Sequence, residues 1–327
     1  MPLIPLTRRA ALQGLGVAAA SSLVSPFARA FAAEPALTFL AVGDWGRDGA
    51  YHQADVAARM AETAEATGAR FVLAVGDNFY EDGVTGVADP KWKTSFEDVY
   101  AAPSLQIPWQ AALGNHDYHG NTQAQLDYAK TSSRWRMPAR WYGFSQTAPD
   151  GARADFFVLD TSPMIQAYYA DGAQKVKVAG QDVKAQMAWF EAALAASTAD
   201  WKIVIGHHPV YAGRTPGLAP KPTSGESPEG GSPDLIASIA PLLKQHGAAL
   251  YINGHDHVLQ HILRDGAHFI CTGAGSKTRM DCRADGGDFC SLQSGYTAYA
   301  VTRRRLSVAY RDYTGAELKV VEIERGA

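Results

Sequence analysis

The sequence is poor in cysteine. Its 327 residues contain three, Cys271, Cys282 and Cys290, and none of them belongs to a C-x-x-C pair. A zinc site built from thiolates is therefore not expected. Cys282 and Cys290 flank a turn-rich segment, which favours a loop-closing disulfide in an oxidising compartment, with two free thiols as the alternative. Cys271 lies in an apolar run and is expected to be a small buried hydrophobe.

Long apolar runs, charge blocks and a serine-nucleophile motif are also missing. No apolar run reaches the roughly 20 residues that span a bilayer, so an integral membrane protein is excluded. The 30 Lys and Arg are balanced by 33 Asp and Glu without a long block of one sign, which argues against a nucleic-acid partner. No Gly-x-Ser-x-Gly follows a predicted strand, which disfavours a covalent serine mechanism. A composition of 46% hydrophobic and 19% charged residues is that of one large globular domain.

The first 33 residues resemble an export signal. Arg8 and Arg9 precede an Ala-rich apolar stretch, and small residues follow up to Ala33, as at a cleavage site. We predict a twin-arginine signal over residues 1–33 and one folded domain over residues 34–327. The domain would meet the twin-arginine translocation machinery during export and work in the periplasm or outside the cell. The alternative is an ordinary N-terminal helix that begins with two arginines.

One local pattern recurs five times. A short apolar run is followed at once by a glycine, or by Asn-Gly, and then by a residue able to bind a metal. Continuous apolar runs of this length predict buried strands, and helical patterns lie between them. The predicted strands cover residues 37–42, 71–75, 109–113, 202–205 and 249–252, and the predicted helices 53–66, 181–196 and 234–246. Since loops after the carboxyl ends of such strands share one sheet edge, we expect the five loops to converge.

Together the five loops supply seven potential ligands. All of them carry oxygen or nitrogen donors: Asp44, Asp77, Tyr80, Asn115, His207, His255 and His257. Seven donors suit two ions that share one bridging ligand. A phenol, with an ordinary pKa of about 10, is bound as phenolate most readily by a trivalent ion, so Tyr80 favours Fe(III). The other donors suit Fe(II), Zn or Mn as the second ion. Two adjacent ions can activate a hydroxide and bind phosphoryl oxygens, which predicts hydrolysis of phosphate esters.

These segments resemble the metallophosphoesterase superfamily, and specifically the small purple acid phosphatases of the tartrate-resistant type. Further family-like segments are Gly120-Asn121, Ala124-Gln125, Arg134-Trp135, Leu159-Asp160-Thr161 and Gly273-Ala274-Gly275. The resemblance implies a four-layer α/β fold over residues 34–327, in which two packed mixed β-sheets are flanked by helices. It also implies which residues bind each ion. Asp44, Tyr80 and His257 would bind Fe(III), and Asn115, His207 and His255 would bind the divalent ion. Asp77 would bridge the two ions. Related phosphodiesterases usually lack the tyrosine.

Two further residues are predicted to be catalytic. His116, beside Asn115, would face the leaving-group oxygen and donate a proton, and Asp117 would orient it. A supporting histidine without a proton role is the alternative. The tartrate-resistant enzymes place a second histidine in the loop after the fourth motif, but residues 211–233 contain none. This Gly- and Pro-rich loop is either a disordered surface excursion or a lid over the site.

The predicted function is that of an exported acid phosphatase. It would hydrolyse small-molecule phosphate monoesters through a metal-bound hydroxide at a dinuclear Fe(III)–M(II) centre, where M is Fe, Zn or Mn. The first alternative is a phosphodiesterase that uses the same two ions. The second is a non-catalytic phosphate binder or an iron protein with a redox function.

Overall fold

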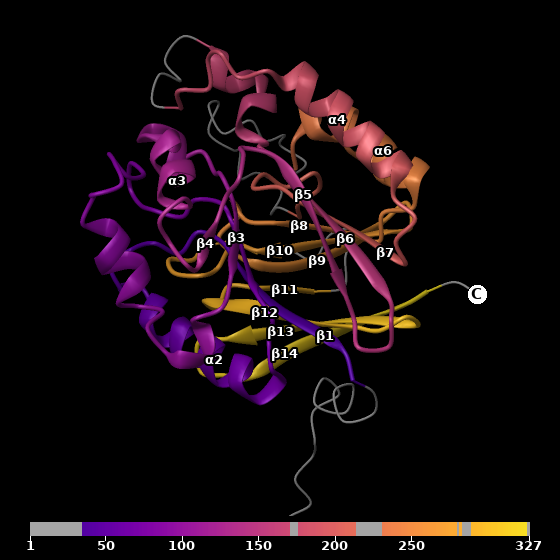
Figure 1. Cartoon of the computed structure of the whole chain (residues 1–327), viewed down its shortest axis with the longest axis horizontal. Helices are drawn as coiled ribbons and strands as arrows, with labels where there is room; N and C mark the ends of the chain where they lie inside the picture. Colours follow the sequence, from indigo (N-terminus) through magenta and orange to yellow (C-terminus); the bar gives the residue numbers. More distant parts are fainter. Residues whose placement is uncertain (1–34, 171–175, 214–230, 280, 283–288, 326–327) are drawn as a thin grey trace, which may run out of the picture.

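The described part of the chain is layered (Figure 1). The structure is a computed structural model, and it describes residues 35–170, 176–213, 231–279, 281–282 and 289–325. These residues form two seven-stranded mixed β-sheets that pack against each other, with helices on the outer faces. The four-layer α/β architecture implied by the resemblance is confirmed.

The first sheet combines parallel and antiparallel strands. Strands β1 to β4 are parallel to one another, and β12 to β14 add an antiparallel half beside β1. Their order across the sheet is β14 (Glu317–Glu324), β13 (Arg305–Asp312), β12 (Gly295–Val301), β1 (Leu37–Val42), β2 (Val72–Val75), β3 (Trp109–Ala112) and β4 (Trp135–Arg136).

The second sheet has a parallel centre and antiparallel edges. Strands β6, β7, β8 and β10 are parallel, while β5, β9 and β11 pair antiparallel. Their order is β11 (Phe289–Ser291), β9 (Leu259–Arg264), β10 (Ala267–Thr272), β8 (Leu250–Asn253), β7 (Trp201–Ile205), β6 (Arg153–Val158) and β5 (Tyr142–Thr147).

Among the described residues, two of the three predicted helices are present as single helices. The α-helices are α2 (Gln53–Thr67), α3 (Thr122–Tyr128), α4 (Val183–Ala196), α5 (Pro233–Ser238) and α6 (Ala240–His246). The short helix α3 was not predicted. The single helix predicted over residues 234–246 is wrong, because the chain breaks it at Ile239. Pro241 explains the break: proline has no amide hydrogen, and its ring collides with the carbonyl four residues earlier.

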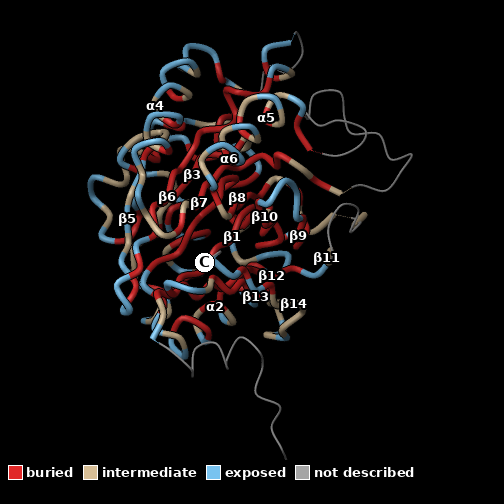
Figure 2. Tube along the Cα trace, turned by 90° about the vertical axis from the view of Figure 1, so that its right-hand side faces the viewer, coloured by how far each residue is buried: buried red, intermediate tan, exposed pale blue. Residues whose placement is uncertain are grey.

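Two hydrophobic layers hold the sheets and helices together. Along β1, Phe39 and its same-face neighbours enter the layer between the sheets, where Phe39 stacks on Tyr299 with ring centroids 4.4 Å apart. Leu40 on the opposite face belongs to the outer layer, together with Met60 of α2. The central strands of both sheets are accordingly buried, while the edge strands β5, β11 and β14 and the outward faces of the helices are partly exposed (Figure 2). Strands covered on both faces explain the continuous apolar runs of the sequence.

The parallel strands bring the five predicted loops to one edge. Strands β1, β2 and β3 are neighbours in the first sheet, and β7 and β8 are neighbours in the second. All five strands run in the parallel part of their sheets, so their carboxyl ends point to the same side. A cluster of buried aromatic rings supports the first three loops: Trp45 and Phe79 are both fully buried, with ring centroids 5.4 Å apart.

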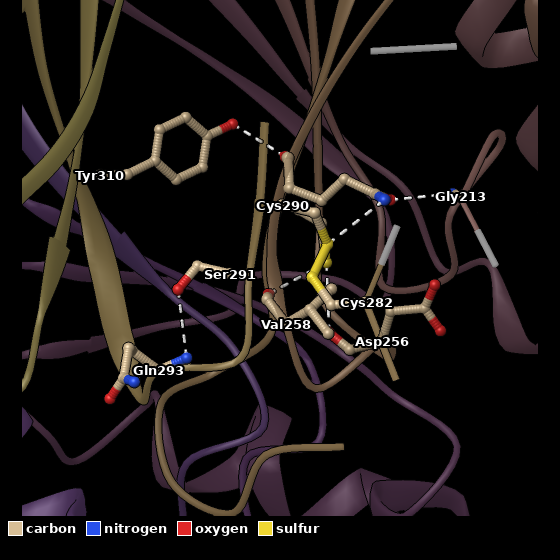
Figure 3. Close-up of a disulfide and its surroundings, with 10 residues drawn as sticks. Gly213, Asp256, Val258, Cys282, Cys290, Ser291, Gln293 and Tyr310 are labelled. Atoms are coloured by element: carbon tan, nitrogen blue, oxygen red, sulfur yellow. Dashed lines mark hydrogen bonds between the residues drawn. A yellow bond between two sulfur atoms is a disulfide. The ribbon is translucent and has the colours of Figure 1, made fainter. Parts of the chain in front are cut away.

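The cysteines are arranged as the sequence favours. Cys282 and Cys290 form a disulfide beside strand β9, and the Sγ atom of Cys290 lies 3.5 Å from the side-chain nitrogen of Gln260 (Figure 3). Cys271 is free and buried, with Sγ 3.2 Å from the carbonyl oxygen of Asp256. The disulfide closes the loop that was predicted to be closed, and the alternative of two free thiols is not the one adopted.

Some predictions fall on other parts of the chain. The export signal predicted over residues 1–33 lies outside the described residues, and so does most of the loop 211–233 that was considered as a lid. Among the residues that are described, no helix combines the length and the apolar character needed to cross a membrane.

Candidate metal centre

The loops after the strands turn through unusual backbone conformations. Asp44, Asp77 and His255 all have positive φ angles, of 59°, 49° and 66°. Non-glycine residues rarely adopt such angles, and they persist where the surrounding structure enforces them. The glycines beside them leave room for ligands from other loops: a Cβ atom on Gly76 would lie 2.5 Å from Nδ1 of His207, and one on Gly114 would overlap Asp77. The glycines of the recurring pattern thus allow the loops to interlock.

Three of the predicted ligands form an oxygen-rich cluster, which consists of Asp44, Tyr80 and His257. The phenol oxygen of Tyr80 lies 2.9 Å from Oδ1 of Asp44 and 3.0 Å from Nε2 of His257. The same His257 nitrogen lies 3.3 Å from Oδ1 of Asp44. Asp44 is fully buried and Tyr80 nearly so. Neighbouring ligands of an octahedral ion with bonds of about 2.1 Å lie about 3 Å apart, so this spacing fits a metal shell.

The other three form a nitrogen-rich cluster, which consists of Asn115, His207 and His255. Oδ1 of Asn115 lies 2.9 Å from Nδ1 of His255 and 3.2 Å from Nε2 of His207. The two imidazole nitrogens are 3.3 Å apart. His207 is fully buried, whereas Asn115 and His255 are partly exposed. This half of the centre is therefore partly accessible to solvent.

Asp77 belongs to both clusters through a single atom. Its Oδ2 lies 3.0 Å from the phenol oxygen of Tyr80 and 3.3 Å from Nε2 of His207. Its other oxygen accepts a hydrogen bond of 2.7 Å from the backbone amide of His116. The carboxylate is thereby oriented with one oxygen between the clusters. The structure brings all seven predicted ligands together in this way.

The nitrogen-rich cluster gathers lone pairs that need a cation. Nδ1 of His207 donates its hydrogen to the carbonyl of Val75 at 3.0 Å, so Nε2 of the neutral ring carries a lone pair. That lone pair faces the carbonyl oxygen of Asn115 and the carboxylate of Asp77, which are acceptors as well. A histidine that binds a metal through one ring nitrogen usually donates the hydrogen of the other ring nitrogen to a carbonyl or carboxylate.

The pKa values of His207 and Asp77 also indicate that this part of the site needs positive charge. Burial lowers the pKa of His207, but the carboxylate of Asp77 outweighs it and raises that pKa to about 9. Burial likewise raises the pKa of Asp77, yet the imidazoles of His207 and His116 hold it well below its ordinary value. Without a metal, a proton on His207 supplies the missing charge. The donor set therefore fits a metal that displaces this proton.

Tyr80 is a neutral phenol unless a metal binds it. Burial, followed by the carboxylates of Asp44 and Asp77, raises the pKa of Tyr80 well above its ordinary value, and the guanidinium of Arg47 opposes them. Ionisation therefore needs a strongly charged cation at the phenol oxygen. The donor chemistry of this cluster fits a trivalent ion, as the sequence predicts.

The ring of His116 is oriented by a residue other than the predicted partner. Nδ1 of its ring contacts the carbonyl of Glu81, which can only accept, so Nδ1 carries a hydrogen and Nε2 is left for another partner. The prediction that Asp117 orients this ring is wrong. The carboxylate of Asp117 is fully buried and accepts hydrogen bonds from the amide of Gly114, at 2.8 Å, and the side chain of Gln125, also at 2.8 Å.

Asp117 instead fixes the loops that carry the ligands. Besides Gly114, it accepts from the backbone and side-chain nitrogens of Asn78, at 3.1 and 3.2 Å. Asn78 also donates to the carbonyl of Ala112 at the end of β3. Sequence reasoning missed this network, although Asn78 and Gln125 both lie inside the segments that carry the resemblance. Asp117 thus connects the loop after β2 with the loop after β3.

His208 is close to the centre but is not available to a metal. Its Nδ1 lies 2.9 Å from the hydroxyl of Thr161, and its Nε2 lies 2.8 Å from the hydroxyl of Tyr168. Both ring nitrogens are therefore bonded to protein. The hydroxyl of Thr161 also accepts the backbone amides of His207 and His208, at 3.2 and 3.1 Å. Thr161 and Tyr168 were not predicted as site residues; they hold the loop after β7 in place.

Comparison with known proteins agrees with this geometry. Residues 37–259 match the family model of the calcineurin-like phosphoesterases. Purple acid phosphatase 7 of Arabidopsis thaliana is 34% identical over 297 residues, which are 85% of this chain and 83% of the relative. Tartrate-resistant acid phosphatase type 5 of Homo sapiens is 32% identical over 320 residues, 90% of this chain and 93% of the relative.

Solved structures share the fold. GAP50, described as the anchor in the inner membrane complex of Plasmodium, superimposes with a TM-score of 0.72 and 26% identity over 90% of each chain. The purple acid phosphatase PPD1 from yellow lupin gives a TM-score of 0.60 and 16% identity over 88% of this chain and 54% of that one. The match to the family model and the identity to these relatives lead to one assignment: the chain belongs to the calcineurin-like phosphoesterase family, with purple acid phosphatases among its relatives.

Proposed function

We propose that this chain is an exported acid phosphatase that hydrolyses phosphate monoesters at a dinuclear Fe(III)–M(II) centre. In this proposal Asp44, Tyr80 and His257 hold the ferric ion. Asn115, His207 and His255 hold the divalent ion, which is Fe, Zn or Mn. Asp77 would be a ligand of both ions. The observation that carries the proposal is the position of its Oδ2, within 3.3 Å of donors from both clusters.

The ions, when bound, supply a nucleophile from water and positive charge for the phosphoryl oxygens. The protein side chains prepare the centre for both tasks. Asp44 and Tyr80 bring two negative groups to one half, whereas the other half adds neutral ligands to the shared Asp77. This asymmetry suits a trivalent and a divalent ion, and the net positive charge of the loaded centre attracts a phosphate monoester dianion.

His116 is the proposed proton donor. The carbonyl of Glu81 accepts the hydrogen of Nδ1, which fixes the ring orientation and leaves Nε2 for the substrate. The backbone amide of the same residue is bonded to Asp77, so the ring is tied to the centre of the site. When protonated, Nε2 donates its hydrogen to the leaving-group oxygen as the ester bond to phosphorus breaks. Activity at acidic pH is proposed because the leaving-group oxygen is protonated more readily there.

Export and the preference for monoesters rest on other arguments. The paired Arg8 and Arg9 ahead of an apolar stretch support export. The disulfide between Cys282 and Cys290 fits an oxidising compartment. Tyr80 and the purple acid phosphatase relatives favour monoesters over diesters.

The test compares substrates on one metal-loaded preparation. Hydrolysis of an aryl phosphate monoester and of the corresponding diester is measured at pH 5 with equal protein and metal content. The proposal predicts a higher kcat/KM for the monoester. A higher value for the diester identifies a phosphodiesterase. Phosphate binding without turnover of either ester identifies a binding protein, a function without catalysis.

A further inference from the structure

Tyr80 has a charged neighbour that the proposed reaction does not use. The guanidinium carbon of Arg47 lies 3.6 Å from the centroid of the Tyr80 ring, which is close for a cation over an aromatic face. The imidazole of His116 lies near the same ring, with centroids 4.4 Å apart and planes inclined by 50°. The ring of Tyr80 is thus in contact with a permanent cation.

The position of Arg47 is built into the loop. Its backbone amide donates to the side-chain carbonyl of Gln53 at 3.0 Å, and Gln53 is itself fully buried and bonded to the backbone of Ser95. The amide of Tyr80 donates to the carbonyl of Gly46, the residue before Arg47, at 2.9 Å. These bonds fix the loops that carry the guanidinium and the ring.

The guanidinium is largely removed from water. The side chain of Arg47 is 8% exposed, and its Nε is buried without a hydrogen-bond partner among the described residues. One terminal nitrogen forms an ion pair with Glu81, whose side chain is 66% exposed and therefore well screened. A buried cation that gives up hydrogen bonds to lie on a ring interacts with that ring more strongly than an exposed one.

We propose that Arg47 tunes the bond between Tyr80 and the ferric ion by stabilising the electrons of the phenolate ring. This inference rests on the proposed metal centre. Among the described residues, the hydrogen-bond partners of the phenol oxygen come from the metal clusters, and Arg47 is not one of them. Arg47 therefore acts on the face of the ring and leaves the oxygen to the metal. It is a positioning and tuning residue that touches neither metal nor substrate.

The visible spectrum responds directly to such tuning. The colour of an iron–phenolate arises when an electron moves from the phenolate to Fe(III). A cation on the ring lowers the energy of the donor electrons, so the transition needs more energy and occurs at shorter wavelength. Loss of the cation moves the band to longer wavelength, whereas a structural role would change protein stability without moving the band.

The experiment uses the full chain loaded with iron. Absorption spectra and iron content are recorded for the wild type, Arg47→Gln, Arg47→Lys and Lys277→Gln. The last is the matched control, because Lys277 is a second cation that lies over the ring of Tyr51, at 5.7 Å, whereas Arg47 lies over the ring of Tyr80. We expect Arg47→Gln to move the band to longer wavelength by on the order of 20 nm. Arg47→Lys shifts it less, and Lys277→Gln leaves it in place.

The outcomes separate this inference from the proposed function. A wild-type band that stays unchanged in Arg47→Gln overturns the role of Arg47 and leaves ligation by Tyr80 intact. A wild type that binds iron without a visible band overturns ligation by Tyr80, and the inference with it. If Arg47→Gln retains no iron, Arg47→Lys is compared with the wild type instead, and an unchanged band in that variant overturns the role of Arg47.

Discussion

The two halves of the candidate centre differ in charge and in exposure. The oxygen-rich cluster carries the buried Asp44 carboxylate and the Tyr80 phenol, together with the imidazole of His257, which is the one partly exposed side chain of these three. The nitrogen-rich cluster carries two imidazoles and an amide, and two of these three side chains are partly exposed. Asp77 is common to both.

This difference supports the proposal that the site holds two unlike ions. Hard anionic oxygens favour a trivalent ion, and neutral nitrogens favour a divalent one. The nitrogen-rich half, with two partly exposed side chains against one, is the half that solvent and substrate would reach more easily. We therefore expect a substitution in one cluster to weaken binding of the ion at that cluster alone. A substitution at Asp77 should weaken binding of both ions.

The largest effect is expected from a change at the shared residue. Asp77→Asn removes the negative charge between the clusters and should release both ions. Hydrolysis of an aryl phosphate then falls by on the order of 10³-fold or more, because several kcal/mol of charge stabilisation are lost. Metal content and rate are measured together, with Asp127→Asn on the exposed face of α3 as the control. Retention of both ions in Asp77→Asn would contradict the shared position of this residue.

Separate damage to each half is the next test. Tyr80→Phe should abolish the visible band while the divalent ion stays bound, and His255→Ala should release the divalent ion while the band remains. Each substitution should lower the affinity for the ion at its own cluster by more than the roughly 10–100-fold that a supporting residue contributes. Metal analysis of both variants beside the wild type measures this. If the two substitutions release the same ion, the division into two clusters is wrong.

A smaller effect is expected at the buried support. Asp117→Asn places an amide hydrogen where the carboxylate now accepts from Gly114 and Asn78. At pH 8 the carboxylate is ionised, since burial and the neighbouring Asp77 raise its pKa to about 7. We expect divalent-metal affinity to fall by roughly 10–100-fold without a change in the position of the visible band. Unchanged affinity would show that this network does not position Asn115.

The last expected effect is a gradual dependence on pH. In the metal-free protein His207 retains its proton up to its raised pKa of about 9, so a metal at this residue must displace that proton below pH 9. Apparent affinity of the nitrogen-rich cluster should therefore rise by about tenfold per pH unit between pH 6 and 8. Competition with a chelator in the Tyr80→Phe background isolates this cluster. A flat profile would mean that no proton leaves His207.

Much of the site could be predicted because its ligands follow strands. A buried strand is recognised by its continuous apolar run, and the residue after it must lie at the sheet edge. The ligands at Asp44, Asp77 and His207 could therefore be placed from the sequence alone. The break between α5 and α6 was also readable, since Pro241 cannot continue a helix.

Partners that depend on side-chain direction could not be predicted. Asp117 follows His116 directly, but its carboxylate points into the core toward Asn78, and the ring of His116 turns to Glu81. Likewise, His208 is bonded by Tyr168, forty residues away in the sequence. Adjacency in sequence does not determine which side chains meet, because the turn between two residues can send them in opposite directions.

The central claim is that Asp77 joins two unlike ions. Crystals of the metal-loaded protein, measured by anomalous diffraction at and below the iron edge, test it most directly. The account predicts two peaks, with iron bonded to the Tyr80 oxygen and Oδ2 of Asp77 bonded to both ions. A single peak, or two peaks without Asp77 between them, would contradict it.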